Sequence, residues 1–259
     1  MNAYLLPARR WYLLVVLALL ILVPRAVQAA RDEAVDFLND DFYAEEGAET
    51  EVPDPLEPLN RVMFTFNDKA YLWVLKPVTT TYADTVPWEM RWCIDSFFNN
   101  LLEPVRFANA LLQLRLGDAG TILGRFLINS TLGVFGLADV AEREFEIPTV
   151  EASLGETLAT WGIGDGLYLV VPFYGSTTLR DFTGTMAETF VTPYYLLADS
   201  WREESLIYAG KNINNLTFHL GEYEQMKELS FDPYIALRNG YFQYRRQQRS
   251  RAETENNGE

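Results

Sequence analysis

Apolar residues recur every three or four positions along much of the chain, and this spacing predicts a mainly helical fold. One such series follows Asp54-Pro55-Leu56-Glu57, where Asp54 can cap a helix, Pro55 suits its first turn and Glu57 lies near the positive end of its dipole. The same start signal returns at Asp232-Pro233, before a helix expected to reach about Arg246, and at Thr192-Pro193. The first series comprises Leu59, Val62, Met63, Phe66, Ala70, Trp73 and Val74.

Three further segments have less complete patterns of secondary structure. Residues 88–116 have a helical pattern, which we expect to break or kink near Glu103-Pro104, because proline removes a donor and clashes with the preceding turn. Ser200 and Glu203 form a capping box before an amphipathic helix with apolar positions from Ala209 to Met226. Residues 167–172 are compatible with a short extended segment.

Residues 118–141 form the most unusual stretch, because it is almost entirely apolar and contains four glycines. A helix that lacks a polar face is either buried in protein or faces lipid. Arg125, Asn129 and Asp139 would be costly in lipid unless they were paired, so a buried helical hairpin is the favoured interpretation. The glycines would permit close approach of two helices.

The termini differ from this apolar middle. Residues 1–29 combine Arg9 and Arg10, a charge-free apolar run and small residues before Ala29, which predicts a secretory signal peptide cleaved after Ala29. An uncleaved anchor is the alternative, although the run is short for a span. Residues 30–53 are acidic and are expected to be a disordered tether, 54–246 to be the helical domain, and 247–259 to be a disordered tail.

Charge and chemistry exclude several functions. The formal net charge is −15, and removal of the arginine-containing signal peptide makes it more negative, so binding to nucleic acid or to anionic headgroups is disfavoured. His219 is the single histidine and Cys93 the single cysteine, which leaves little for a zinc site, and no G-x-S-x-G nucleophile motif is present. The glycines at 162, 164 and 166 lack the spacing of a dinucleotide loop. No enzyme activity and no cofactor or metal are therefore expected.

Five strings carry a resemblance to a known family. They are DPLEPLNRVMFTFN at 54–67, NNLLEPVRFANALLQ at 99–113, RFLINSTLGVFGLADVA at 125–141, LGETLATWGIGDGLYLVVPFYGSTTLRD at 154–181 and DPYIALRNGYFQYR at 232–245. Their order and content resemble the MlaA/VacJ family over about residues 53–246.

The resemblance implies a mainly α, ring-like protein seated in the inner leaflet of the Gram-negative outer membrane, on its periplasmic side, with little or no β structure. It further implies an amphipathic channel for phospholipid, association with a trimeric outer-membrane porin, and transfer of stray phospholipid to a soluble periplasmic carrier, which maintains lipid asymmetry. The candidates for channel or membrane contact are Leu59, Met63, Phe66, Asn67, Arg125, Phe126, Leu127, Asn129 and Phe135; those for partner docking are Tyr234, Tyr241 and Tyr244.

Several alternatives stay open. Arg125 and Asn129 suit either a headgroup path or an internal hydrogen-bond network. Family members commonly carry a cysteine at the signal cleavage site, whereas Val27-Gln28-Ala29-Ala30 stands there in this sequence, so no lipid anchor is expected. A scaffold that binds porin without moving lipid is the second functional hypothesis, and a lipid hydrolase that uses His219 is a distant third.

Overall fold

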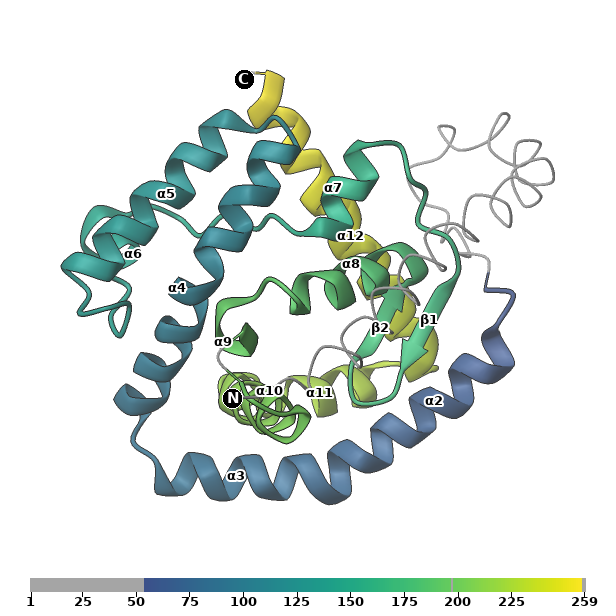
Figure 1. Ribbon diagram of the computed structural model, residues 1–259. Helices are drawn as coiled ribbons and strands as arrows, with labels where there is room; N and C mark the ends of the chain where they lie inside the picture. Colours follow the sequence, from purple (N-terminus) through teal and green to yellow (C-terminus); the bar gives the residue numbers. More distant parts are fainter. Residues whose placement is uncertain (1–53, 197, 258–259) are drawn as a thin grey trace. The chain divides into compact units, whose positions relative to one another are not determined.

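The computed structural model describes residues 54–196 and 198–257, with side chains up to Gln248. The expected signal peptide and acidic segment lie outside the described residues. The described part is mostly helical with one two-stranded sheet, as the apolar spacing predicted. Around α8, α9 and α10, the longer helices α2–α3, α4 and α12 form a ring-like frame (Figure 1).

The elements follow one another closely along the chain. Their bounds are α2 Glu57–Ala70, η1 Tyr71–Leu75, α3 Lys76–Thr85, α4 Trp88–Leu112, α5 Leu116–Thr131, α6 Val140–Phe145, α7 Leu154–Thr160, β1 Tyr168–Val171, β2 Gly175–Thr178, α8 Leu179–Thr189, α9 Pro193–Leu196, α10 Trp201–Leu216, α11 Glu222–Leu229 and α12 Pro233–Asn257.

The rod made by α2, η1 and α3 contains one π-helical turn at its centre. Pro77, near the start of α3, has no N–H and its ring crowds the carbonyl four residues earlier, so a wider turn relieves the clash. The amide of Lys76 donates instead to the carbonyl of Tyr71. The buried Tyr71 anchors this turn, because its hydroxyl donates to Glu224 Oε2 at 3.0 Å.

The short sheet is held to α2 by two asparagines. β1 pairs antiparallel with β2, with Tyr168 opposite Thr178. The amide of Asn60 donates to Tyr168 O at 3.0 Å and accepts from Val170 N at 2.9 Å. One helical heptad later, Asn67 donates to Val171 O at 3.0 Å and accepts from Phe173 N at 2.9 Å. These side chains satisfy edge groups of β1 that a third strand would otherwise bind.

Three sequence-based helix boundaries are wrong. α4 continues through Pro104 without a break and ends at Leu112. The helix expected through Met226 is two helices, because the chain leaves α10 at Thr217 and turns at Gly221, whose φ is 93°. α12 continues to Asn257 instead of ending near Arg246. The starts predicted at Asp232-Pro233 and Thr192-Pro193, and the extended segment that includes β1, are confirmed.

The described residues contain two small apolar clusters. One lies between α4 and α5 and includes Ala110, Ala119 and Ile122. The other lies where β1 meets α12 and is formed by Tyr168, Val170 and Tyr234. None of the described helices combines the length and the apolarity that a membrane span requires.

Candidate functional site

Polar side chains fill much of the contact between α4 and α5. On α5 the inward positions are Ala119, Ile122, Arg125 and Asn129, spaced by three and four residues. Arg125 is only 2% exposed, although it carries a permanent charge. On the α4 side, the buried Asn100 and Glu103 contact Ser130 and Arg125 of α5, and the buried Arg106 lies one turn further along.

Arg125 is the centre of an ion-pair network. Its Nη2 lies 2.6 Å from Asp139 Oδ2, its Nη1 donates to Ile147 O, and its Nε lies 3.6 Å from Glu103 Oε1. Arg106 extends the network, with Nη2 at 2.9 Å from Glu151 Oε1. Buried charges are tolerated only when they are paired in this way.

The two carboxylates nearest to Arg125 respond oppositely to their surroundings. Burial raises the pKa of Glu103, and the charges of Arg106 and Arg125 only partly offset it. Burial also acts to raise the pKa of Asp139, but hydrogen bonds from Asn129 and from Glu142 N, together with Arg125, outweigh it and lower that pKa. Asp139 is therefore the firmly ionised partner of Arg125.

Asn129 completes the hairpin between α5 and α6. Its Nδ2 donates to Asp139 Oδ1 at 2.9 Å, and its Oδ1 accepts from Ala141 N at 2.9 Å. At Gly136, whose φ is 86°, an added Cβ would lie 2.5 Å from the side chain of Asn100, so the intervening turn fits closely against α4. Arg125 and Asn129 are thus engaged inside the fold, as the internal-network alternative held.

The outer side of α5 is apolar and exposed. Leu127 is 54% exposed and Phe135, in the turn after α5, is 79% exposed. The expectation that this stretch is buried is wrong for its outer side. The expected close approach at Gly120 and Gly124 is also wrong, because an added Cβ at either position would meet nothing within 4 Å. Other exposed apolar side chains of this surface, which we call the α5 outer face, are Leu116, Leu123, Leu132, Val134 and Leu137.

The candidates on α2 divide between two sides of the helix. Leu59 and Phe66 are exposed, and the Phe66 ring packs edge-on against Phe173 of the hairpin turn. Met63 instead packs against the aromatic cluster, and the Asn67 amide is bound to the hairpin backbone. Phe126 on α5 is half-buried.

The three tyrosines expected to form a docking surface do not share one. Tyr234 is 1% exposed and donates its hydroxyl hydrogen to Asp54, so it is a core residue and this expectation is wrong for it. Tyr241 is half-buried and its hydroxyl donates to Asp181 Oδ2 at 2.7 Å. Tyr244 is exposed. Helical periodicity does not distinguish an aromatic core residue from an aromatic contact residue, which explains the error.

The single histidine of the chain follows the end of α10. His219 is exposed, with Nδ1 at 3.1 Å from Glu222 Oε1. No cluster of three or more His, Cys, Asp or Glu residues with the geometry to hold a metal ion occurs among the described residues. Sequence reasoning missed Asn60, Glu103 and Arg106, although each stands at helical spacing from an apolar residue that faces inward.

Comparisons with known proteins agree on one family. A family model described as MlaA lipoprotein matches residues 52–248. The intermembrane phospholipid transport system lipoprotein MlaA of Escherichia coli is 34% identical over 197 residues, which are 73% of this chain and 76% of that protein. An uncharacterised protein of Rickettsia bellii is 32% identical over 219 residues, which are 82% of this chain and 84% of that protein.

A solved structure supports the same assignment. It is described as the structural basis for maintenance of bacterial outer membrane lipid asymmetry, has a TM-score of 0.63 and 34% identity, and covers 74% of this chain and 97% of its own. With a family model over most of its length and relatives above 30% identity, this chain belongs to the MlaA lipoprotein family.

Proposed function

We propose that this protein moves phospholipid at the Gram-negative outer membrane, from the outer leaflet through an amphipathic path to a soluble periplasmic carrier. Membership of the MlaA family and the names of its relatives support phospholipid trafficking. The proposal includes a seat in the inner leaflet and association with a trimeric porin, both of which the sequence resemblance implies. The protein is proposed to act by binding and passing lipid, without covalent chemistry.

The observation that most supports a membrane seat is the inverted distribution of polar and apolar side chains on α4 and α5. Arg125 and Asn129 face inward and Leu127 faces outward, whereas a helix in water has the reverse pattern. An exposed apolar patch of this extent marks a contact with protein or lipid. Because the chain is strongly acidic, apolar burial must supply the attraction to a membrane.

The α5 outer face supports the apolar part of an amphipathic path. Moving an acyl chain through water exposes its methylenes, at a cost of about 0.8 kcal/mol each, so a transporter must offer apolar surface to the tail. The α5 outer face offers such a surface, whereas Arg125 and Asn129 on the inner side are already bound to Asp139. The proposal assigns the exposed candidates Leu59, Phe66, Leu127 and Phe135 to membrane contact.

The test is phospholipid exposure in the outer leaflet, measured by phospholipase sensitivity of intact cells lacking this gene. Exposure should rise, and the wild-type gene should reverse it. Leu127→Lys and Phe66→Lys should fail to reverse it, since lysine in place of leucine at a lipid-facing site costs about 3 kcal/mol. Asn215→Lys, a neutral-to-lysine change at an exposed position of α10, is the matched control and should complement fully.

Other outcomes would point elsewhere. Unchanged exposure in the deletion strain would replace transport by the scaffold hypothesis, as would release of the protein from wild-type membranes by salt or carbonate washing. Loss of phospholipid hydrolysis on substitution of His219 would support the hydrolase hypothesis instead.

A further inference from the structure

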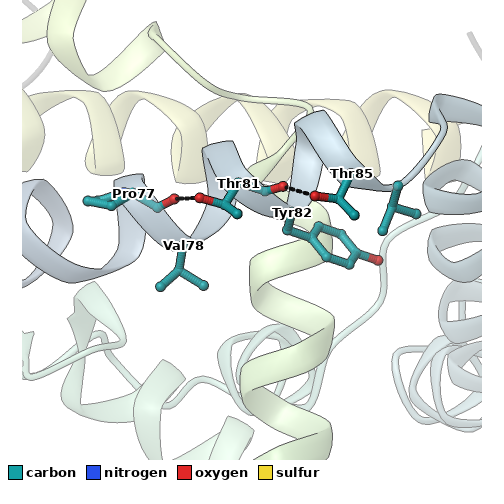
Figure 2. A pocket seen from close by; sticks show the side chains of 6 residues that line it. Pro77, Val78, Thr81, Tyr82 and Thr85 are labelled. Carbon is teal, nitrogen blue, oxygen red and sulfur yellow. Dashed lines mark hydrogen bonds between the residues drawn. The ribbon is translucent and has the colours of Figure 1, made fainter.

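α3 lines an open groove that lies apart from the α4–α5 contact and the aromatic cluster. It has a volume of about 460 Å³ and is lined by Pro77, Val78, Thr81, Tyr82, Thr85 and Val86 (Figure 2). The first five of these positions follow an i, i+1, i+4, i+5, i+8 series, so they share one face of the helix, and Val86 is the residue that follows its end.

Three hydroxyl groups line this groove, but each already donates its hydrogen. Thr81 Oγ1 donates to Pro77 O at 2.8 Å and Thr85 Oγ1 donates to Thr81 O at 2.7 Å, as the dashed lines in Figure 2 show. Tyr82 Oη donates to Asn214 Oδ1 at 3.0 Å. What remains toward the groove is mainly methyl groups, a proline ring and an aromatic ring, so the occupant must be apolar.

The lining of the groove is better suited to a hydrocarbon chain than to a peptide. A peptide brings backbone N–H and C=O groups that need partners when water is displaced, and the lining has no free donor to offer. An acyl chain brings none. At about 30 Å³ for a group the size of a water molecule, the volume holds roughly fifteen methylene-sized groups, which is most of one acyl chain.

A free cation stands at one end of this groove. Arg91 Nε donates to the carbonyl of Val86 at 3.1 Å, and its guanidinium lies 5.7 Å from the centre of the Phe218 ring. Among the described residues, no carboxylate is paired with it. Lys76, just before the other end, is already paired with Glu224 at 2.7 Å. Of these two cations in the described part of the chain, only Arg91, at the Val86 end, has no carboxylate partner.

The opposite end of the groove continues into exposed apolar surface. Val78 is 45% exposed, and Val74, one turn earlier in the π-helical segment, is exposed as well. A chain in the groove thus has an apolar route at one end and a cation at the other.

We propose that the α3 groove binds one acyl chain of a phospholipid, with the lipid phosphate at Arg91. This rests on the proposed function for its ligand class. Asn214 connects the two parts of the site, because its Nδ2 donates to Arg91 O at 2.9 Å while its Oδ1 accepts from Tyr82 Oη. Arg91 is the headgroup-binding residue and α3 supplies the wall for the tail.

Photo-crosslinking of the full chain in detergent tests this site. A benzophenone amino acid is placed at Thr81, in the groove, or at Thr80, an exposed neighbour on another face of α3. With labelled phosphatidylglycerol, crosslinking at position 81 should exceed that at position 80 about tenfold, because the lipid is expected to occupy the groove and not the neighbouring face of α3. Arg91→Gln should lower the yield at position 81 several-fold and leave position 80 unchanged.

Two further measurements keep the test independent of the probe itself. Diacylglycerol with the same labelled chain, which lacks phosphate, should crosslink at position 81 several-fold less than phosphatidylglycerol, and Arg91→Gln should abolish that preference. Thr81→Trp should reduce the phospholipid that copurifies with the protein, whereas Thr80→Trp should not, with circular dichroism and Tm confirming folding of both.

The outcomes separate this site from the proposed function. Equal crosslinking at positions 80 and 81, or loss of selectivity for phosphate with Arg91 intact, would overturn the groove as a lipid site. If phospholipid exposure in the outer leaflet still rises in the deletion strain, the proposed function stands even without lipid binding in the α3 groove. Selective crosslinking with no exposure phenotype would support the groove and overturn transport.

Discussion

The α4–α5 contact and the aromatic cluster at β1 and α12 bury opposite kinds of side chain. Between α4 and α5, charged and amide groups such as Arg125 and Glu103 are enclosed, while leucines point outward. In the aromatic cluster, Tyr168 and Tyr234 are enclosed with Val170, and the basic side chains of Arg61 and Arg238 lie over the Tyr234 ring. The α5 outer face thus exposes apolar side chains, whereas the aromatic cluster encloses them.

The difference teaches that the partners that a helix meets decide which of its faces is buried. Between α4 and α5, paired polar groups around Arg125 join the small apolar cluster that contains Ile122. In the aromatic cluster, removal of apolar area from water remains the driving force. Changes at matched positions in the two regions can test this distinction.

The largest effect is expected on the inner side of α5. Ile122→Lys places an unpaired charge in a fully buried position and should lower the free energy of unfolding by more than about 4 kcal/mol. Leu127→Lys, on the α5 outer face of the same helix, should change it by less than about 0.5 kcal/mol in aqueous buffer, where this face meets water. Denaturant unfolding followed by circular dichroism measures both, and equal losses would contradict the assignment of inner and outer sides.

A somewhat smaller loss is expected from opening the ion-pair network. Arg125→Leu leaves Asp139 and Glu103 buried without their shared partner and should lower the free energy of unfolding by about 3–5 kcal/mol. Arg143→Ala, which loses only the contact with the Trp92 ring at 5.2 Å, should lower it by about 0.5–1 kcal/mol. An Arg125→Leu protein as stable as wild type would mean that apolar packing, and not ion pairing, holds α4 to α5.

The smallest effect is expected from acid acting on Asp139. The pKa of Asp139 is lowered below 3.8 in the folded state, so the unfolded state binds its proton first as the pH falls. Its stabilising contribution is therefore complete above pH 3.8 and is lost as the pH falls through the folded pKa. Burial raises the pKa of Tyr168 in the aromatic cluster, so that group stays neutral throughout this range.

Unfolding midpoints of wild type and Asp139→Asn, measured from pH 5 to pH 2.5, check this expectation. The variant should be less stable at pH 5, and the difference should narrow below pH 3.8 as the wild-type carboxylate becomes protonated. Parallel curves over the whole range would show that Asp139 does not titrate as proposed.

Start signals and spacing predicted much of the local structure. Asp232-Pro233 and Thr192-Pro193 mark helix starts because capping and proline geometry depend on a few adjacent residues. The break expected at Pro104 is absent, since the long packing surface between α4 and α5 holds the helix together across one missing donor. Propensity is a weak guide where tertiary contacts are extensive.

The sequence by itself determined the helical class, the family and the set of residues from which a site must be built. Only the tertiary structure decided where each of these side chains points: Tyr234 into a core, Asn60 and Asn67 onto β1, Arg125 onto Asp139 and Leu127 outward. Helical periodicity gives the faces of a helix but not what covers each face, because that depends on elements distant in the sequence and on whether water or lipid surrounds them. The α3 groove illustrates the same limit, since its lining follows from one helix but its cation comes from the next.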